Sequence, residues 1–165
     1  MAQHEYFRRD IGHQIYAGDT ELHIAAAARR VDTVIDLLKR GADVRARNRR
    51  GAEPLHYAVD GGPDNPGAQR AIVAALLAAG ADPNAADKNG TPPLHRAVRN
   101  RSAAAVAALL EGGADIRQTN RKGSTPMDLT RWTTGKSGSG SAAAKAQREE
   151  IVRLLVQRGA GSAGT

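Results

Sequence analysis

Cysteine is absent from the 165-residue chain, and aromatic residues make up only 3% of it. Without cysteine the protein has no disulfide framework, no thiolate zinc site and no cysteine nucleophile. Hydrophobic residues reach an ordinary 41%, so the core is built mainly from Ala, Leu, Val and Ile. Side chains of this size favour closely packed helices.

Long apolar runs are also missing. Glu5, Arg8, Arg9 and Asp10 interrupt the N-terminal region, where a secretory signal needs an unbroken apolar stretch. No segment approaches the ~18 apolar residues of a membrane span. We therefore expect a cytoplasmic protein with no membrane contact. Its length suits one compact domain, and its formal charge of +7 favours acidic partners.

One pattern recurs along the chain. A Leu-His pair stands at 22–23, 55–56 and 94–95, each time four residues after a glycine. A Leu-Leu pair and then Gly-Ala-Asp follow each copy, ending at Asp43, Asp82 and Asp115. The step from the first histidine to the second is 33 residues. Self-similarity at a fixed period of this length indicates a repeat architecture.

Two copies carry insertions. The step between the second and third histidines is 39 residues, and the six extra ones fall in the Gly/Pro-rich run 61–67. A fourth copy opens at Gly123 and closes at Gly159-Ala160, with thirteen extra residues around 133–140. Both insertions separate the two apolar segments of their copy. We expect loops near 61–68 and 133–143, on the same edge of the stack.

These features resemble the ankyrin repeat, whose signature is Thr-Pro-Leu-His followed by two Ala-like positions. Glu53-Pro54 alters the Thr-Pro element of the second copy, and Met127-Asp128 replaces Leu-His in the last. The resemblance implies an all-α solenoid of stacked helix-turn-helix units joined by β-turn fingers. It divides the chain into an N-terminal capping segment 1–17, repeats at about 18–47, 48–86, 87–119 and 120–160, the last degenerate, and a flexible tail 161–165.

The apolar spacing agrees with this division. Leu22, Ala25 and Ala26 predict a short first helix, and apolar positions 31, 34, 37 and 38 predict an amphipathic second helix. Gly41 supplies the left-handed residue that ends such a helix. Ser141 is placed to cap a long helix over 142–158.

The residues that could serve catalysis or metal binding do not form a recognisable site in the sequence pattern. His23, His56 and His95 hold equivalent positions in elements ~8–10 Å apart, whereas zinc needs nitrogen ligands about 2.1 Å from one point. We expect these rings to hydrogen-bond the loop of their own or the adjacent repeat. Gly135-Lys136-Ser137 resembles the end of a phosphate-binding loop, but Thr130 stands where the pattern needs glycine. We predict no enzyme, no cofactor, no metal and no small-molecule substrate.

The resemblance also implies where a partner binds, because partners of ankyrin-like stacks contact the finger tips and the exposed positions of the first helices. Carried over position by position, it gives Arg47, Arg49, Arg50, Lys88, Arg96, Arg99, Arg121, Lys122 and Trp132 as partner-binding residues. Apart from Asp60 and Asp87, this surface carries little acid. Two alternatives remain: basic fingers that only keep the protein soluble, and a Trp132 that covers the core of the last repeat.

The predicted function is a protein-protein interaction module, an adaptor or regulatory binding protein that is monomeric on its own. It uses a basic concave face to hold an acidic partner protein. The alternative is binding to nucleic acid or another polyanion. The finger arginines lack the interleaved aromatics that single-strand binders use for stacking, which favours the protein partner.

Overall fold

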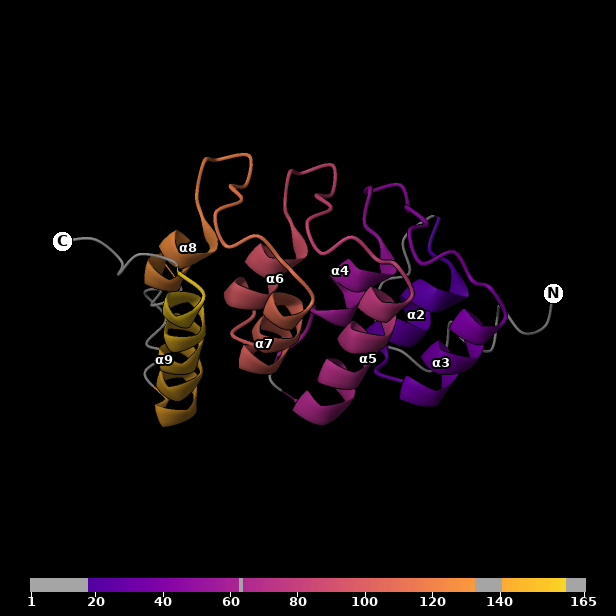
Figure 1. The fold of residues 1–165 in the computed structure, drawn as a ribbon, viewed down its shortest axis with the longest axis horizontal. Helices are drawn as coiled ribbons and strands as arrows, with labels where there is room; N and C mark the ends of the chain where they lie inside the picture. Colours follow the sequence, from indigo (N-terminus) through magenta and orange to yellow (C-terminus); the bar gives the residue numbers. More distant parts are fainter. Residues whose placement is uncertain (1–17, 63, 133–140, 160–165) are drawn as a thin grey trace.

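The computed structural model describes residues 18–62, 64–132 and 141–159. Within these residues the chain forms eight helices and no strand. The helices come in four pairs: α2 (Glu21–Ala27) with α3 (Val31–Lys39), α4 (Pro54–Ala58) with α5 (Pro66–Ala78), α6 (Pro93–Arg99) with α7 (Ala103–Glu111), and α8 (Pro126–Trp132) with α9 (Ala142–Gln157). The pairs stack side by side (Figure 1), which confirms the all-α solenoid.

The stack has two layers of helices. The first helices α2, α4, α6 and α8 lie next to the fingers, and the second helices α3, α5, α7 and α9 form the layer beyond them (Figure 1). Each second helix contacts the next one, and the first helices do the same. No helix in the described ranges has both the length and the apolar character that a membrane crossing requires.

One core position repeats in every pair. Leu22, Leu55, Leu94 and Met127 stand at the same place in their first helices, and all four are at least 94% buried. Each such side chain packs against its own repeat and its neighbour, because neither helix of a pair can bury its apolar face alone. The repeat phase read from the sequence is therefore the phase of the core.

Two of the three signature histidines, His23 and His95, bond to the next finger. The third, His56, accepts from the N–H of Glu53 in its own repeat at 3.0 Å, and its Nε2 has no partner among the described residues. Nδ1 of His23 accepts from the N–H of Thr20 at 3.1 Å, so Nε2 carries the proton and donates to the carbonyl of Ala52, 2.9 Å away in the next finger. His95 makes the same outward bond to Ser124 at 2.8 Å. Its Nδ1 has no partner in the described part of the chain, because the residue three before it is Pro92, which has no N–H. These bonds confirm the expected role of the histidines.

The last repeat replaces this histidine with an acid. Oδ2 of Asp128 accepts from the N–H and the hydroxyl of Thr125, both at 2.8 Å, and so caps its own helix. The long helix α9 then covers the end, with Ser141 accepting from the N–H of Ala144 at its start. Ile151 and Leu155 are its buried residues.

The insertion of the second repeat is short, and an arginine of the first repeat holds it in place. Helix α5 begins at Pro66, inside the range expected for the loop, and Asn65 caps it from a left-handed conformation. The guanidinium of Arg29 donates to the carbonyls of Asp60 and Gly62 at 3.2 and 2.9 Å. The expected N-terminal cap, the core of the second insertion and the tail lie outside the described residues.

Candidate partner-binding surface

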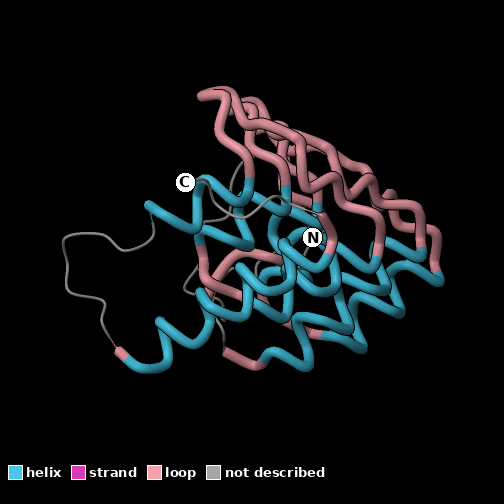
Figure 2. Tube along the Cα trace, turned by 60° about the vertical axis from the view of Figure 1, so that its left-hand side comes forward, coloured by secondary structure: helices cyan, strands magenta, loops and turns pink. Residues whose placement is uncertain are grey.

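Three fingers, residues 40–53, 79–92 and 112–125, follow one another along one edge of the stack (Figure 2). The N–H of Lys88 donates to the carbonyl of Arg50 at 2.9 Å, and the guanidinium of Arg121 donates to the carbonyl of Lys88. A Cβ at Gly51 would lie 3.0 Å from the backbone nitrogen of Lys88, and one at Gly90 would lie 2.9 Å from Cβ of Arg121. Successive fingers therefore touch, and their tips keep a fixed spacing.

Each fingertip is a preformed turn. The side-chain oxygens of Asn48, Asp87 and Asn120 each accept from the N–H groups two and four residues later, at 2.9 to 3.1 Å. Side chains of this type close such turns by imitating a backbone acceptor. The one or two residues that directly follow each acceptor are thus held at the tip, and they include the predicted cations Arg49, Arg50, Lys88, Arg121 and Lys122.

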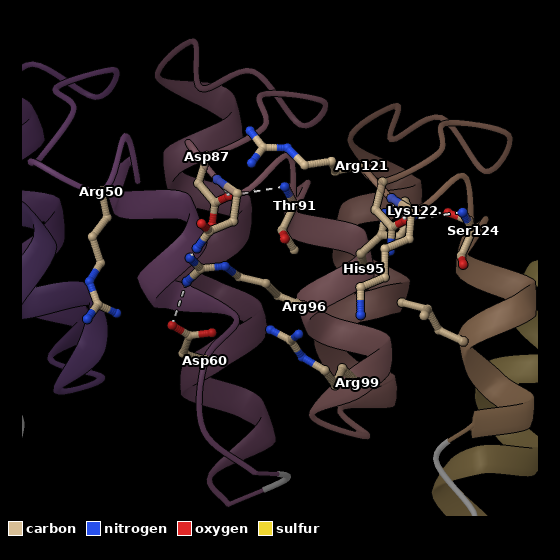
Figure 3. Close-up of a pocket in the computed structure, with 13 residues that line it drawn as sticks. Arg50, Asp60, Asp87, Thr91, His95, Arg96, Arg99, Arg121, Lys122 and Ser124 are labelled. Atoms are coloured by element: carbon tan, nitrogen blue, oxygen red, sulfur yellow. Dashed lines mark hydrogen bonds and ion pairs between the residues drawn. The ribbon is translucent and has the colours of Figure 1, made fainter.

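A groove of about 860 Å³ runs between the fingers and the first helices. It is lined by Arg50 from the first finger, Asn89 from the second, Arg121 and Lys122 from the third, and Arg96 and Arg99 from α6. Of the described residues, Asp60 and Asp87 are the acidic ones in its lining. Charge is unevenly distributed in it, as Figure 3 shows.

The centre of the groove is an ion-paired cluster of Asp60, Asp87 and Arg96. Arg96, with 13% of its side chain exposed, donates to Oδ2 of Asp60 at 2.8 Å and to Oδ2 of Asp87 at 2.6 Å. Asn100 donates to the other oxygen of Asp60 at 3.3 Å. The cluster joins the end of α4, the second finger and α6, so Arg96 holds two repeats together and leaves little charge for a partner.

Burial and pairing shift the pKa values of this cluster in opposite directions. Burial raises the pKa of Asp60, and Arg96 offsets only part of the shift. Burial also acts to raise the pKa of Asp87, but the hydrogen bonds from Arg96 and from the N–H groups of Thr91 and Asn89 outweigh it and hold that pKa below its usual value. Below them, burial and then Arg96 lower the pKa of His56 to about 4.

The ends of the groove are different. Arg50 stands at one end, while Arg99 and Lys122 stand toward the other (Figure 3). Arg99 and Lys122 are exposed, and their side chains make no hydrogen bond or ion pair with the described part of the chain. Arg49 and Lys88 are in the same situation on the tips of the first two fingers. These four side chains can therefore meet a partner's acidic groups without breaking a bond.

Two predicted residues lie apart from this group. Arg47 contacts Oε1 of Glu53 at 3.3 Å and donates to the carbonyl of Ala86. Glu53 has only 1% of its side chain exposed, so Arg47 compensates a buried charge and does not line the groove. Trp132 ends α8, and its side chain lies outside the described part of the chain.

Sequence reasoning missed part of the neutral polar lining. Asn120 occupies the position of Asp87 in its own finger. Aligning the fingers residue by residue would have found it. The pairing of Arg96 with Asp60 carried no such signal, because the residues are 36 apart.

The histidines and acids do not form a metal site in residues 18–62, 64–132 and 141–159, where no group of three or more could hold an ion. Burial lowers the pKa of His95 at the groove wall, with Arg99 acting in the same direction. The lining is therefore a set of charged and amide groups suited to holding a polar ligand.

Comparison with known families agrees with this architecture. Residues 6–87 match a family described as ankyrin repeats (3 copies), and residues 76–129 match one described as ankyrin repeats (many copies). Curated proteins gave no match. Ankyrin repeats are generally protein-protein interaction modules, and the family is typically a non-enzymatic scaffold. The two matches together span residues 6–129, and the chain belongs to the ankyrin repeat family.

Proposed function

We propose that this chain holds an acidic partner protein against its fingers and groove, as an adaptor or regulatory binding protein. The observation that supports the proposal is a set of exposed cations that make no bond with the described chain. Arg49, Lys88 and Lys122 stand on fingers of fixed spacing, and Arg99 stands at the end of α6. Because the finger backbone is already held in its turns, it loses little freedom on binding. An acidic surface would gain charge complementarity there. A monomeric free state and a cytoplasmic location stay predictions.

A protein partner fits this groove better than a nucleic acid. A phosphate backbone that followed the groove would pass the carboxylates of Asp60 and Asp87 at its centre. Among the described residues the lining contains one apolar side chain, Leu129, and no Phe, Tyr or Trp, so a base lacks the stacking platform that single-strand binders use.

Charge reversal tests the proposal with matched variants. Lys88→Glu with Lys122→Glu reverses two fingertip cations, and Lys39→Glu with Lys145→Glu reverses two exposed lysines of the second helices α3 and α9. Both variants change the net charge equally. We expect capture of acidic partners, identified by mass spectrometry, to fall about tenfold or more in the fingertip variant alone. Both variants should melt within a few degrees of the parent, because exposed charges contribute little to folding.

Two results would contradict the proposal. Equal loss in both variants would show that only net charge matters. Capture of nucleic acid with a steep, linear fall of log affinity against log salt would instead identify a polyanion-binding protein.

A further inference from the structure

The end of the groove next to the third finger is rich in unused hydrogen-bond donors. Four residues line it: Arg99 of α6, and Asn120, Lys122 and Ser124 of the third finger. We call these four residues the donor end, and Figure 3 shows Arg99, Lys122 and Ser124 in place. Their free groups, which make no bond with the described part of the chain, are a guanidinium, an amide nitrogen, an ammonium and a hydroxyl.

The acceptor oxygens at the donor end are already in use. Oδ1 of Asn120 accepts from the N–H groups of Lys122 and Ser124 at 2.9 and 3.1 Å. The carbonyl of Asn120 accepts from the N–H of Gly123 at 2.9 Å, and the carbonyl of Ser124 accepts from His95 at 2.8 Å. A ligand that enters the donor end meets N–H and O–H groups, so it gains most when it brings acceptor oxygens.

Contacts between α6 and the third finger hold the donor end together. The 2.8 Å bond from His95 to the carbonyl of Ser124 fixes the finger on the start of α6. Arg99 follows His95 by four residues on the same helix face, at about 5–6 Å between Cβ atoms, and its charge contributes to the low pKa of His95. Lys122 and Ser124 are both bonded to the side chain of Asn120. The two free cations therefore stand on walls whose relative position is fixed.

The charge of the donor end distinguishes between acidic groups. Arg99 and Lys122 each carry one positive charge, whereas the carboxylates of the groove are already paired with Arg96. A carboxylate brings one negative charge, and so does each phosphodiester of a nucleic acid. A phosphate monoester carries about −1.5 to −2 charges at pH 7 and offers three acceptor oxygens, and a guanidinium can bind two of them at once. The monoester therefore matches both the charge and the donors.

We infer that the donor end binds a phosphate monoester on the partner protein, carried by a phosphorylated serine or threonine side chain. Arg99 and Lys122 neutralise its charge, and the amide of Asn120 and the hydroxyl of Ser124 donate to the remaining oxygen. Arg49 and Lys88, which lie outside the groove lining, contact other acidic groups of the partner. This inference rests on the proposed function and names the acidic group that the groove holds.

Synthetic peptides test the chemistry of this group. Three nine-residue peptides have four glycines on each side of a central phosphoserine, aspartate or serine, with blocked ends. Each would be titrated into the full chain labelled with ¹⁵N and followed by two-dimensional NMR. We expect the phosphoserine peptide to bind about three- to tenfold more tightly than the aspartate peptide, and the serine peptide most weakly. The side-chain signals of Asn120 and Arg99 should shift with phosphoserine.

Two matched double variants locate the site. Arg99→Gln with Lys122→Gln removes both charges of the donor end, and Arg49→Gln with Lys88→Gln removes two exposed cations outside the groove lining. Both variants lose the same net charge, and both should melt within a few degrees of the parent. We expect the first to lose the preference for phosphoserine over aspartate and the second to keep it.

Four outcomes would overturn the inference. They are no binding of the phosphoserine peptide at millimolar concentration, equal affinity for phosphoserine and aspartate, equal loss of preference in both variants, and tighter binding of a short oligo(dT) strand than of the phosphopeptide. The proposed function is tested separately by partner capture. If fingertip reversal abolishes capture but phosphatase treatment of the partner leaves it unchanged, the acidic partner stands and only the phosphate is wrong.

Discussion

Arg96 and Arg99 are three residues apart on α6, and the fold uses them in different ways. Arg96 is nearly buried and ion-paired with Asp60 and Asp87. Arg99 is exposed and makes no bond with the described chain. Each lies near one signature histidine: Arg96 contributes to the low pKa of His56, and Arg99 acts in the same direction on His95.

The contrast shows that different groove residues contribute to folding stability and to binding: Arg96 stabilises the stack, and Arg99 is available to a partner. Residues three apart share a helix face, so the helical period predicts the same exposure for both arginines. The difference comes from the second finger and the end of α4, which bring Asp87 and Asp60 into direct ion pairs with Arg96. Arg99 has only a longer-range electrostatic interaction with Asp60. A count of basic residues on the concave face therefore overestimates the charge that a partner meets.

The largest expected effect on the free energy of unfolding comes from replacing Arg96 and Arg99 one at a time. Arg96→Met should lower the free energy of unfolding by about 3 kcal/mol, because Asp87, with 3% of its side chain exposed, would keep a buried charge without its partner. Arg99→Met should change it by less than about 0.5 kcal/mol. Urea unfolding at neutral pH measures both. Similar losses of unfolding free energy in the two variants would show that Arg96 and Arg99 do not differ in their contribution to stability.

A pH titration sharpens the comparison through the histidines. The pKa of His56 is about 4 in the folded protein against an ordinary value of 6.5. Between these values the unfolded chain binds a proton that the folded chain does not, so stability present above pH 6.5 is lost as the pH falls toward 4. His56 alone should cost about 2 kcal/mol at pH 5, and the lowered pKa values of His23 and His95 act in the same direction.

Urea unfolding at pH 7 and pH 5, with an NMR titration of the imidazoles, measures this effect. Arg96→Met should move the pKa of His56 upward and leave His95 unchanged, whereas Arg99→Met should do the reverse. A His56 resonance with a pKa near the ordinary value of 6.5 would contradict the claim that burial and Arg96 lower that pKa.

A smaller effect tests the finger contacts that fix the groove ends. Gly90→Ala should destabilise by about 2 kcal/mol, because Gly90 has a φ of 70° and an added Cβ would lie 2.9 Å from Cβ of Arg121. Gly113→Ala has the same backbone strain, with a φ of 90° and open space around the Cβ, and should cost only about 1 kcal/mol. Thermal melts compare the two. Equal costs would mean that adjacent fingers do not press on one another.

Much of the fold was predictable because the signal repeats. Leu55 and Leu94, read from their place in the copies, are both at most 2% exposed, and His23 and His95 make the expected bonds to the next finger. Each repeat forms the same local structure, so an ambiguous assignment in one repeat is settled by the equivalent positions in the others. Helix lengths were less predictable: α5 begins at Pro66, because Asn65 and Pro66 together form a helix start that composition suggested as loop.

The candidate site was predictable only in outline. The sequence marks which residues are basic and which stand at finger tips, and Arg49, Lys88 and Lys122 are exposed there as expected. It gives no indication that Arg47 compensates the buried Glu53. That pairing depends on how the finger folds back over the start of α4, and a position-by-position transfer from other repeats does not include it.

By itself the sequence determined the period, the core positions and the family, because burial of a repeated apolar pattern needs no partner from outside the pattern. Only the tertiary structure decided which cations remain unpaired. Arg96 meets Asp60 across 36 residues and Asp87 across nine, and the three converge because stacking places α4, the second finger and α6 side by side. Ion pairs depend on distances of a few ångströms, and those distances exist only after the repeats have stacked.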